Sequence, residues 1–181
     1  MADSARSDDV LGGEKIFLRA REEADVAVLQ AELYDDVAAR VRADTRPWVP
    51  LSLDSAASPY RVDKPSDDVA FFSVVEIESG HLAGEALLWG IDLHNRLAHV
   101  GVSLRPGFRG RGLGTDVLRV LCRYGFGIRG LHRLQLETLA DNHRMIEAAK
   151  RAGFDHEGTL RSAAWVDGGY KDEVILGRLT P

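Results

Sequence analysis

The chain of 181 residues is long enough for one domain with a buried core, and its 45% hydrophobic and 28% charged content is ordinary for a globular protein. A formal net charge of −5 argues against generic nucleic-acid binding, and the single cysteine, Cys122, excludes an intrachain disulfide and favours a reducing compartment. No stretch resembles a transmembrane helix and the N-terminus lacks the core of a signal peptide, so we expect a cytoplasmic protein.

The first part of the chain is expected to hold a tail, a strand and two helices. Residues 1–13 are polar and aperiodic, which predicts a disordered tail. Residues 14–181 show no internal repeat and no second domain, so they are expected to form a single domain. A strand is predicted over 14–20, followed by helices over 22–33 and 35–43.

Residues 45–65 combine prolines and serines, which break regular structure, with the apolar side chains of Trp48, Val49, Leu51 and Tyr60. That is more apolar surface than a solvated loop needs. Two interpretations stay open for this segment: a loop that packs on the core, or one wall of a binding cleft.

From residue 69 the pattern changes to alternating apolar segments separated by turn residues, which predicts an antiparallel meander. Apolar residues then recur at helical spacing from Leu113 to Tyr124 and mark one buried stripe, on which Cys122 is expected to be a packed core thiol. A further helix is predicted over 141–152, and Gly153 ends it as a C-cap. The strands predicted in this half are 69–77, 82–91, 97–104, 131–138, 154–160 and 170–179.

Residues 109–115 read Arg-Gly-Arg-Gly-Leu-Gly-Thr and join a strand-like segment to a helical one. A glycine-dense turn at the start of a helix aims backbone N–H groups and the helix dipole at one point, which suits a phosphate. The spacing differs from a Walker loop and from a dinucleotide fingerprint, and a single copy is unlike a repetitive arginine–glycine RNA-binding segment. The alternative is a tight turn whose glycines only permit positive φ.

The surroundings of this turn resemble the GNAT superfamily of acyl-CoA-dependent N-acyltransferases. Residues 109–114 match its Gln/Arg-x-x-Gly-x-Gly/Ala signature, and residues 100–106 resemble its fourth strand and the exit from it. Asn142 and residues 152–154 resemble the two ends of the helix that follows its fifth strand. The resemblance covers about residues 14–179 and implies a GNAT enzyme.

Several shorter features resemble the RimJ/RimL branch of ribosomal-protein N-terminal acetyltransferases within that superfamily. They are residues 91–98, 131–134, 154–158 and 167–172. Many members of the branch act on other substrates, so this resemblance indicates the chemistry better than the acceptor.

The superfamily resemblance implies an α/β (α+β) fold, with a mixed, mostly antiparallel sheet of about six to seven strands and about four helices. It also implies acetyl-CoA as co-substrate and no metal. The pyrophosphate would lie on the amides of the glycine turn, and the pantetheine arm would lie beside the fourth strand like an added strand. The donor-binding residues implied are Val102, Ser103, Leu104, Arg109, Gly110, Arg111, Gly112, Leu113, Gly114, Thr115 and Asn142.

The implied reaction is direct attack of a primary amine on the thioester, which needs a group that removes a proton from the amine. His99 lies where many members carry a catalytic Glu, and an unperturbed histidine pKa of about 6.5 suits the task. Glu137 lies five positions before Asn142 and matches the catalytic Glu of another ribosomal-type branch. Glu85 is a third candidate. His99 pairing with a neighbouring strand, or Glu137 facing solvent, are the structural alternatives.

One departure from the superfamily concerns the acid that protonates the leaving thiolate. Many members carry a Tyr four residues before the closing Gly-Phe, and this chain has Ala149 there. Met145 likewise replaces a Ser that is common after the Asn. Either the thiolate leaves without that acid, or another group such as Tyr170 helps.

These observations lead to one expected function and two alternatives. We expect acetyl transfer from acetyl-CoA to a protein N-terminus or a small amine. The alternatives are another acyl donor such as succinyl-CoA, or a CoA-binding module without turnover. Neither nucleic acid nor a membrane is expected as a partner. A homodimer would be compatible with the branch, but no residue pattern predicts one.

Overall fold

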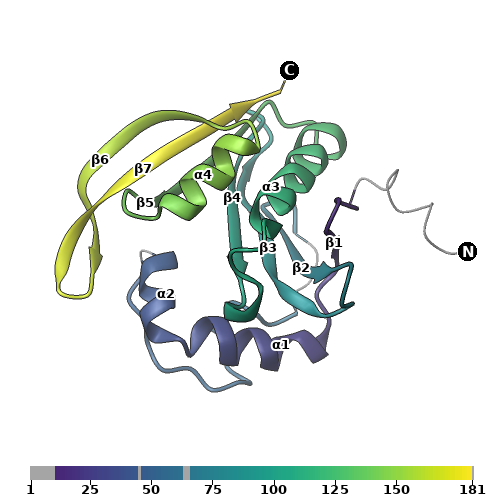
Figure 1. Ribbon diagram of the computed structural model, residues 1–181, viewed down its shortest axis with the longest axis vertical. Coiled ribbons are helices and arrows are strands. Elements are labelled where there is room, and N and C mark those ends of the chain that lie inside the picture. The colour runs from purple at the N-terminus through teal and green to yellow at the C-terminus, as the bar shows by residue number, and fades with distance from the viewer. Residues whose placement is uncertain (1–10, 45, 63–65, 181) are drawn as a thin grey trace, which may run out of the picture.

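The computed structural model describes residues 11–44, 46–62 and 66–180, and its strands form one seven-stranded sheet in the order β1-β2-β3-β4-β5-β7-β6 (Figure 1). Neighbouring strands are antiparallel except β4 and β5, which are parallel. The strands are β1 (Ile16–Arg19), β2 (Val69–Glu76), β3 (Leu82–Asp92), β4 (Leu97–Leu104), β5 (Arg133–Leu139), β6 (Asp155–Val166) and β7 (Gly169–Leu179).

The helices lie on both sides of this sheet, and α3 and α4 lie side by side (Figure 1). The α-helices are α1 (Glu23–Leu29), α2 (Val37–Ala43), α3 (Leu113–Arg123) and α4 (His143–Arg151). Two of them, α1 and α3, continue into one π-helical turn each, Gln30–Tyr34 and Tyr124–Ile128. This arrangement confirms the expected fold: a mixed, mostly antiparallel sheet with four helices. No helix of the described residues is long and apolar enough to cross a membrane.

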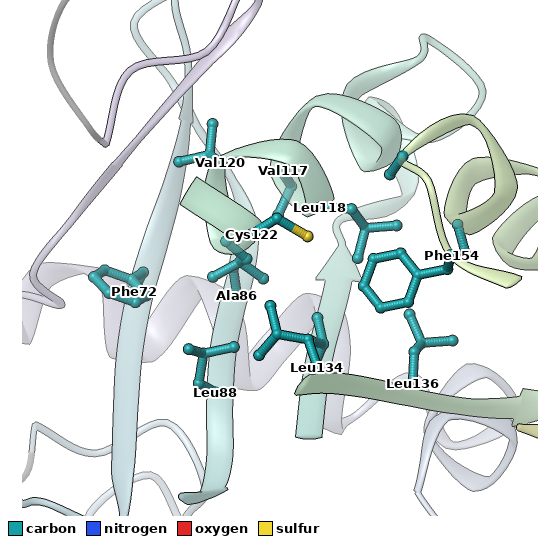
Figure 2. Packing of buried hydrophobic residues seen from close by; sticks show 14 of the residues in the cluster. Phe72, Ala86, Leu88, Val117, Leu118, Val120, Cys122, Leu134, Leu136 and Phe154 are labelled. Carbon is teal, nitrogen blue, oxygen red and sulfur yellow. The ribbon is translucent and has the colours of Figure 1, made fainter. Parts of the chain in front are cut away.

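The main hydrophobic core lies between α3, α4 and one face of the sheet (Figure 2). Leu118 of α3, Leu134 of β5 and Phe154 after α4 are almost completely buried there. The stripe predicted from Leu113 to Tyr124 forms one side of this core, as its helical spacing indicated. Cys122 is buried in it, and burial raises the pKa of its thiol to about 11, so it is a neutral core side chain.

A second apolar cluster covers the opposite face of the sheet. It joins Leu29 of α1 and Tyr34 to Tyr60, whose side chain is fully buried, with Trp48 packed against them. The rings of Tyr34 and Trp48 are 6.1 Å apart. The described part of segment 45–65 is therefore a loop that packs on the core, because its aromatic residues complete this cluster.

Most predicted element boundaries agree with the structure within a few residues, but β6 is longer than the predicted strand over 154–160. The register between β6 and β7 shifts between Leu160 and Ala164, and Ser162 has a φ of 50°. A bulge of this kind interrupts the alternation of the side chains while the strand itself continues. Of the predicted tail, residues 1–10 lie outside the described residues, whereas Gly12 bridges Phe17 of β1.

The two parallel strands at the centre of the sheet separate along their length. Only the first residues of β4 pair with β5, and the last pair joins His99 to Gln135. Beyond this pair β4 continues to Leu104 and β5 to Leu139 without pairing to each other. The edge of β4 that faces β5 is therefore open from Val100 to Leu104, the end of the strand from which the chain continues to α3.

Candidate active site

The predicted phosphate turn lies at the start of α3, directly after the open edge of β4. Gly112 is the N-cap of α3 with a φ of 81°, and no side chain caps the helix. The amides of the first helical turn have no intrahelical partner. Gly110 has a φ of 76°, and a Cβ at Gly110 or at Gly114 would meet no atom within 4 Å, so the turn has open space around it. Unpaired amides with open space at the start of a helix suit an anion such as a phosphate group.

Both arginines of the turn have partners within the protein. Arg111 forms an ion pair with Glu76 at 2.7 Å, and its guanidinium also lies 3.9 Å from Glu78. Arg109 donates from Nε to the carbonyl oxygen of Leu104 at 2.8 Å and so holds the end of β4. The structure thus gives both arginines protein partners at the edge of the turn.

A cationic side chain from outside the glycine motif lies behind the turn. The Nζ of Lys15 donates to the carbonyl oxygen of Arg111 at 3.2 Å. Lys15 precedes β1 and lies far from the motif in sequence, so no local spacing could have identified it. Only the packing of β1 against α3 brings the two segments together.

The open edge of β4 carries the residues expected beside the pantetheine arm. Val102, Ser103 and Leu104 pair with β3 on their other side, opposite Ala86, Glu85 and Gly84 respectively. The pairing with β3 holds this segment in an extended conformation. An extended ligand segment can hydrogen-bond such an edge as an additional strand does.

Two of the three candidate bases meet where β4 and β5 separate. Nδ1 of His99 lies 2.9 Å from Oε1 of Glu137, and both side chains are about one quarter exposed, at 24% and 23%. A carboxylate only accepts hydrogen bonds, so Nδ1 of His99 is the donor to Glu137. In the neutral imidazole, Nε2 is then the nitrogen without a hydrogen and can accept a proton. Gln135 donates from Nε2 to the same Oε1 of Glu137 at 2.5 Å.

Trp89 of β3 completes the surroundings of His99. The two residues are cross-strand partners, and their rings stack at 4.2 Å between centroids with an interplanar angle of 21°. Trp89 is 45% exposed although its side chain is large and aromatic. The alternation of residues in the sequence indicates which face of its strand Trp89 occupies. It does not place Trp89 against His99, because that contact depends on the register between β3 and β4.

Glu85, the third candidate, lies on the same face of β3 as Trp89. It is separate from the pair of His99 and Glu137. It forms an ion pair with Arg21 at 2.6 Å, and the two side chains are only 7% and 3% exposed. Burial raises the pKa of Glu85, and the charge of Arg21 acts in the opposite direction. Glu85 lies opposite Ser103 and His99 opposite Trp89, so about four residues of strand, or roughly 13 Å, separate them.

The residues around α4 have structural partners. Asn142 caps α4, because its side chain accepts from the amide of Met145 at 3.4 Å and donates to Thr138 at 2.9 Å. Ala149 is fully buried in the main core. Tyr170 is 67% exposed and contacts Trp165 at the β6–β7 turn. Among the described residues, no group of three metal-binding side chains comes together.

The family of the chain is shown by a match over most of its length. Residues 15–155 match the model of the acetyltransferase (GNAT) domain, which is most of the chain. The chain therefore belongs to the GNAT family of acetyltransferases, as the sequence resemblance implied.

Individual relatives fall into more than one acceptor class. Spermidine N(1)-acetyltransferase of Escherichia coli (strain K12) is 30% identical over 103 residues, which are 57% of this chain and 55% of that protein. The [ribosomal protein uS5]-alanine N-acetyltransferase of the same strain is 28% identical over 83 residues, 46% of this chain and 43% of that protein. These matches span about half the length of each relative.

The fold extends the similarity over nearly the whole chain. The crystal structure of spermidine N-acetyltransferase from Vibrio cholerae in complex with CoA and spermine has a TM-score of 0.79 to this chain. The match covers 91% of this chain and 95% of that one, at 21% sequence identity. At this identity the likeness concerns the fold.

Proposed function

We propose that the protein transfers an acetyl group from acetyl-CoA to a primary amine, and that His99 and Glu137 act together as the base. The observation that carries this proposal is the 2.9 Å contact between the two side chains at the point where β4 and β5 separate. The phosphate turn at the start of α3 lies at the end of the same strand edge, so a donor bound along this edge extends toward His99.

The donor is held by backbone groups of this chain. The amides of residues 110–115 bind the diphosphate, and residues 102–104 bind the extended arm through the open edge of β4. A backbone amide of this edge also polarises the thioester carbonyl. Asn142 supports this site by holding the start of α4, and its Nδ2 carries a second N–H beside the one donated to Thr138, which can donate to the CoA arm.

The chemistry then needs one base and one acid. The nitrogen of the neutral amine attacks the thioester carbon, an N–C bond forms, and the C–S bond breaks with release of the thiolate. The amine loses a proton to Nε2 of His99, while Glu137 keeps the proton on Nδ1 and stabilises the imidazolium. The imidazolium returns its proton to the thiolate, which removes the need for a tyrosine at the position of Ala149.

The carboxylates near this base favour a positively charged acceptor. Glu173 of β7 lies opposite Leu139 and on the same face of the sheet as Glu137. Burial, together with the charge of Glu137, raises the pKa of Glu173. This surrounding is compatible with a small amine or a protein N-terminus, the two acceptors that the names of the relatives indicate.

Release of free thiol from acetyl-CoA tests the proposal. Wild-type protein is incubated with acetyl-CoA and either spermidine or a peptide with an N-terminal alanine, and the product is identified by mass spectrometry. Thiol release that depends on the amine, with an acetylated product, is expected. Binding of CoA without release would contradict the enzyme and favour a binding module. Release only with succinyl-CoA would reassign the donor.

A further inference from the structure

The phosphate turn is attached to the N-terminal end of the sheet by one buried carboxylate. Asp116, in the first turn of α3, is 5% exposed and accepts three backbone N–H groups from the segment that enters β1. The distances are 3.2 Å from Glu14, 2.7 Å from Lys15 and 3.1 Å from Ile16. Burial of a carboxylate is costly unless it is hydrogen-bonded, and these donors satisfy it. The position of Lys15 relative to the turn is therefore set by the backbone.

From this position the side chain of Lys15 reaches the back of the turn. Its Nζ donates to the carbonyl oxygen of Arg111 at 3.2 Å, and it lies 3.4 Å from where a Cβ of Gly112 would be. The peptide bond between Arg111 and Gly112 is trans, because the described residues contain no cis peptide. In a trans peptide the C=O and the following N–H point in opposite directions. The N–H of Gly112 therefore points away from Lys15.

Lys15 and Arg111 differ in whether a carboxylate lies next to their charge. The guanidinium of Arg111 is 2.7 Å from Glu76, a carboxylate that is itself buried. The ammonium of Lys15 forms no ion pair within 4 Å among residues 11–44, 46–62 and 66–180, and its contact at the turn is a carbonyl oxygen. A cavity of about 290 Å³ opens between Lys15, Glu78 and Arg111.

We propose that Lys15 is a positioning residue for the donor. It holds the Arg111–Gly112 peptide with the Gly112 N–H facing the diphosphate, and it adds a positive charge behind that peptide. The effect acts through the amide, so no direct contact with CoA is required. This inference rests on the proposed function, since it assumes that the turn binds CoA.

The test compares Lys15→Met, which keeps most of the side-chain length without the charge, with Lys15→Arg, which restores a cation. Dissociation constants for CoA are measured by calorimetry at low salt. Lys15→Met is expected to weaken CoA binding by about two- to fivefold, the loss of one exposed charge-assisted contact. Lys15→Arg is expected to recover most of the CoA affinity, and high salt is expected to reduce the difference in affinity between wild type and Lys15→Met. Lys150→Met is the control, because Lys150 is paired with Glu147 at the far end of α4.

A second donor separates positioning of the phosphate turn from a general structural role. S-acetylpantetheine lacks the diphosphate and the nucleotide, so its kcat/KM is expected to be the same in wild type and in Lys15→Met. An equal loss with both donors, or an unchanged dissociation constant for CoA in Lys15→Met, would overturn the inference. Wild-type protein that neither binds CoA nor releases thiol would contradict the proposed function itself.

Discussion

Nδ1 of His99 and Oε1 of Glu137 lie 2.9 Å apart across the point where two parallel strands separate. The two residues are 38 positions apart in the chain, and each was a candidate base on its own. Their contact joins two separate candidates into one pair. In the mechanism that we propose, the carboxylate orients the imidazole and the imidazole exchanges the proton.

The first prediction concerns this unit. His99→Ala is expected to lower kcat by about 10²- to 10⁴-fold, the usual contribution of a general base, and Glu137→Gln by a smaller factor. Because the two groups act together, the double variant should lose no more activity than His99→Ala alone. Steady-state kinetics and CoA binding of all three variants check this. Losses that multiply, or a large change in CoA affinity, would show that the residues act separately.

The second prediction concerns Trp89, whose ring stacks on His99 at 4.2 Å. Trp89→Ala removes this support, so the imidazole samples other rotamers and kcat falls, by about fivefold if one aromatic contact of roughly 1 kcal/mol is lost in the productive geometry. Trp89→Phe keeps a stacking ring and should recover much of the rate. Trp165→Ala is a matched control, because Trp165 is an exposed aromatic on β6. Equal rates for Trp89→Ala and Trp165→Ala would contradict the positioning role.

The third prediction concerns the phosphate turn. Gly112→Trp is expected to abolish CoA binding, because a residue with a side chain cannot easily adopt the φ of 81° at the N-cap of α3. A Cβ at this position would also lie 3.4 Å from the Nζ of Lys15, so the turn would have to change shape and its amides would no longer point at one place. Gly168→Trp is the control for backbone strain alone, since Gly168 has a φ of 78° in the turn between β6 and β7. Calorimetry with CoA and circular dichroism distinguish the two variants. Normal CoA binding by Gly112→Trp would mean that the phosphate site lies elsewhere.

The fourth prediction concerns the buried ion pair between Arg21 and Glu85. Glu85→Gln leaves the charge of Arg21 without a partner, so it should lower the free energy of unfolding by about 3–5 kcal/mol. The double variant Arg21→Met/Glu85→Met removes both charges and should regain most of that stability. Denaturant unfolding measures both changes. If the folded double variant lost as much kcat as His99→Ala, Glu85 would instead be a base of the reaction.

The fifth prediction is a pH dependence of stability that arises from Asp25. Burial alone would raise the pKa of this carboxyl, but hydrogen bonds from Arg19, the amide of Glu22 and Ser73 outweigh burial and lower the pKa to about 2. A carboxyl whose pKa is lower in the folded state stabilises the protein above its unfolded pKa of about 3.9. This stability, about 2 kcal/mol, is lost as the pH falls from about 4 to about 2.

Thermal unfolding of wild type and Asp25→Asn between pH 7 and pH 2 measures the effect of Asp25. Asp25→Asn should be less stable than wild type at neutral pH, and the difference should shrink toward pH 2. A difference that stays constant over this range would assign the stabilisation to the shape of the side chain rather than to its charge.

Local patterns predicted the elements well where the periodicity was regular. The strand predicted over 97–104 agrees with Leu97–Leu104, and the glycine turn opens α3 as expected. The prediction was less accurate for β6, where the shift of register near Ser162 disturbs the alternation on which a strand is recognised. The π-helical turns after α1 and α3 were also not distinguishable, because their residues continue the helical apolar pattern.

The amino-acid sequence by itself indicated the family, because its motifs consist of neighbouring residues at fixed spacing, and the resemblance to that family implied the sheet and its helices. The glycine turn that opens α3 was likewise visible in the local spacing. The tertiary structure alone decided which distant side chains meet. His99 meets Glu137, Arg21 meets Glu85 and Lys15 meets Arg111 across 38, 64 and 96 positions respectively. The contact of His99 with Glu137 depends on the register and the separation of β4 and β5, because a shift by one residue would turn a side chain to the other face. The other two contacts depend on how the segments at the two ends of β1 pack against α3 and β3.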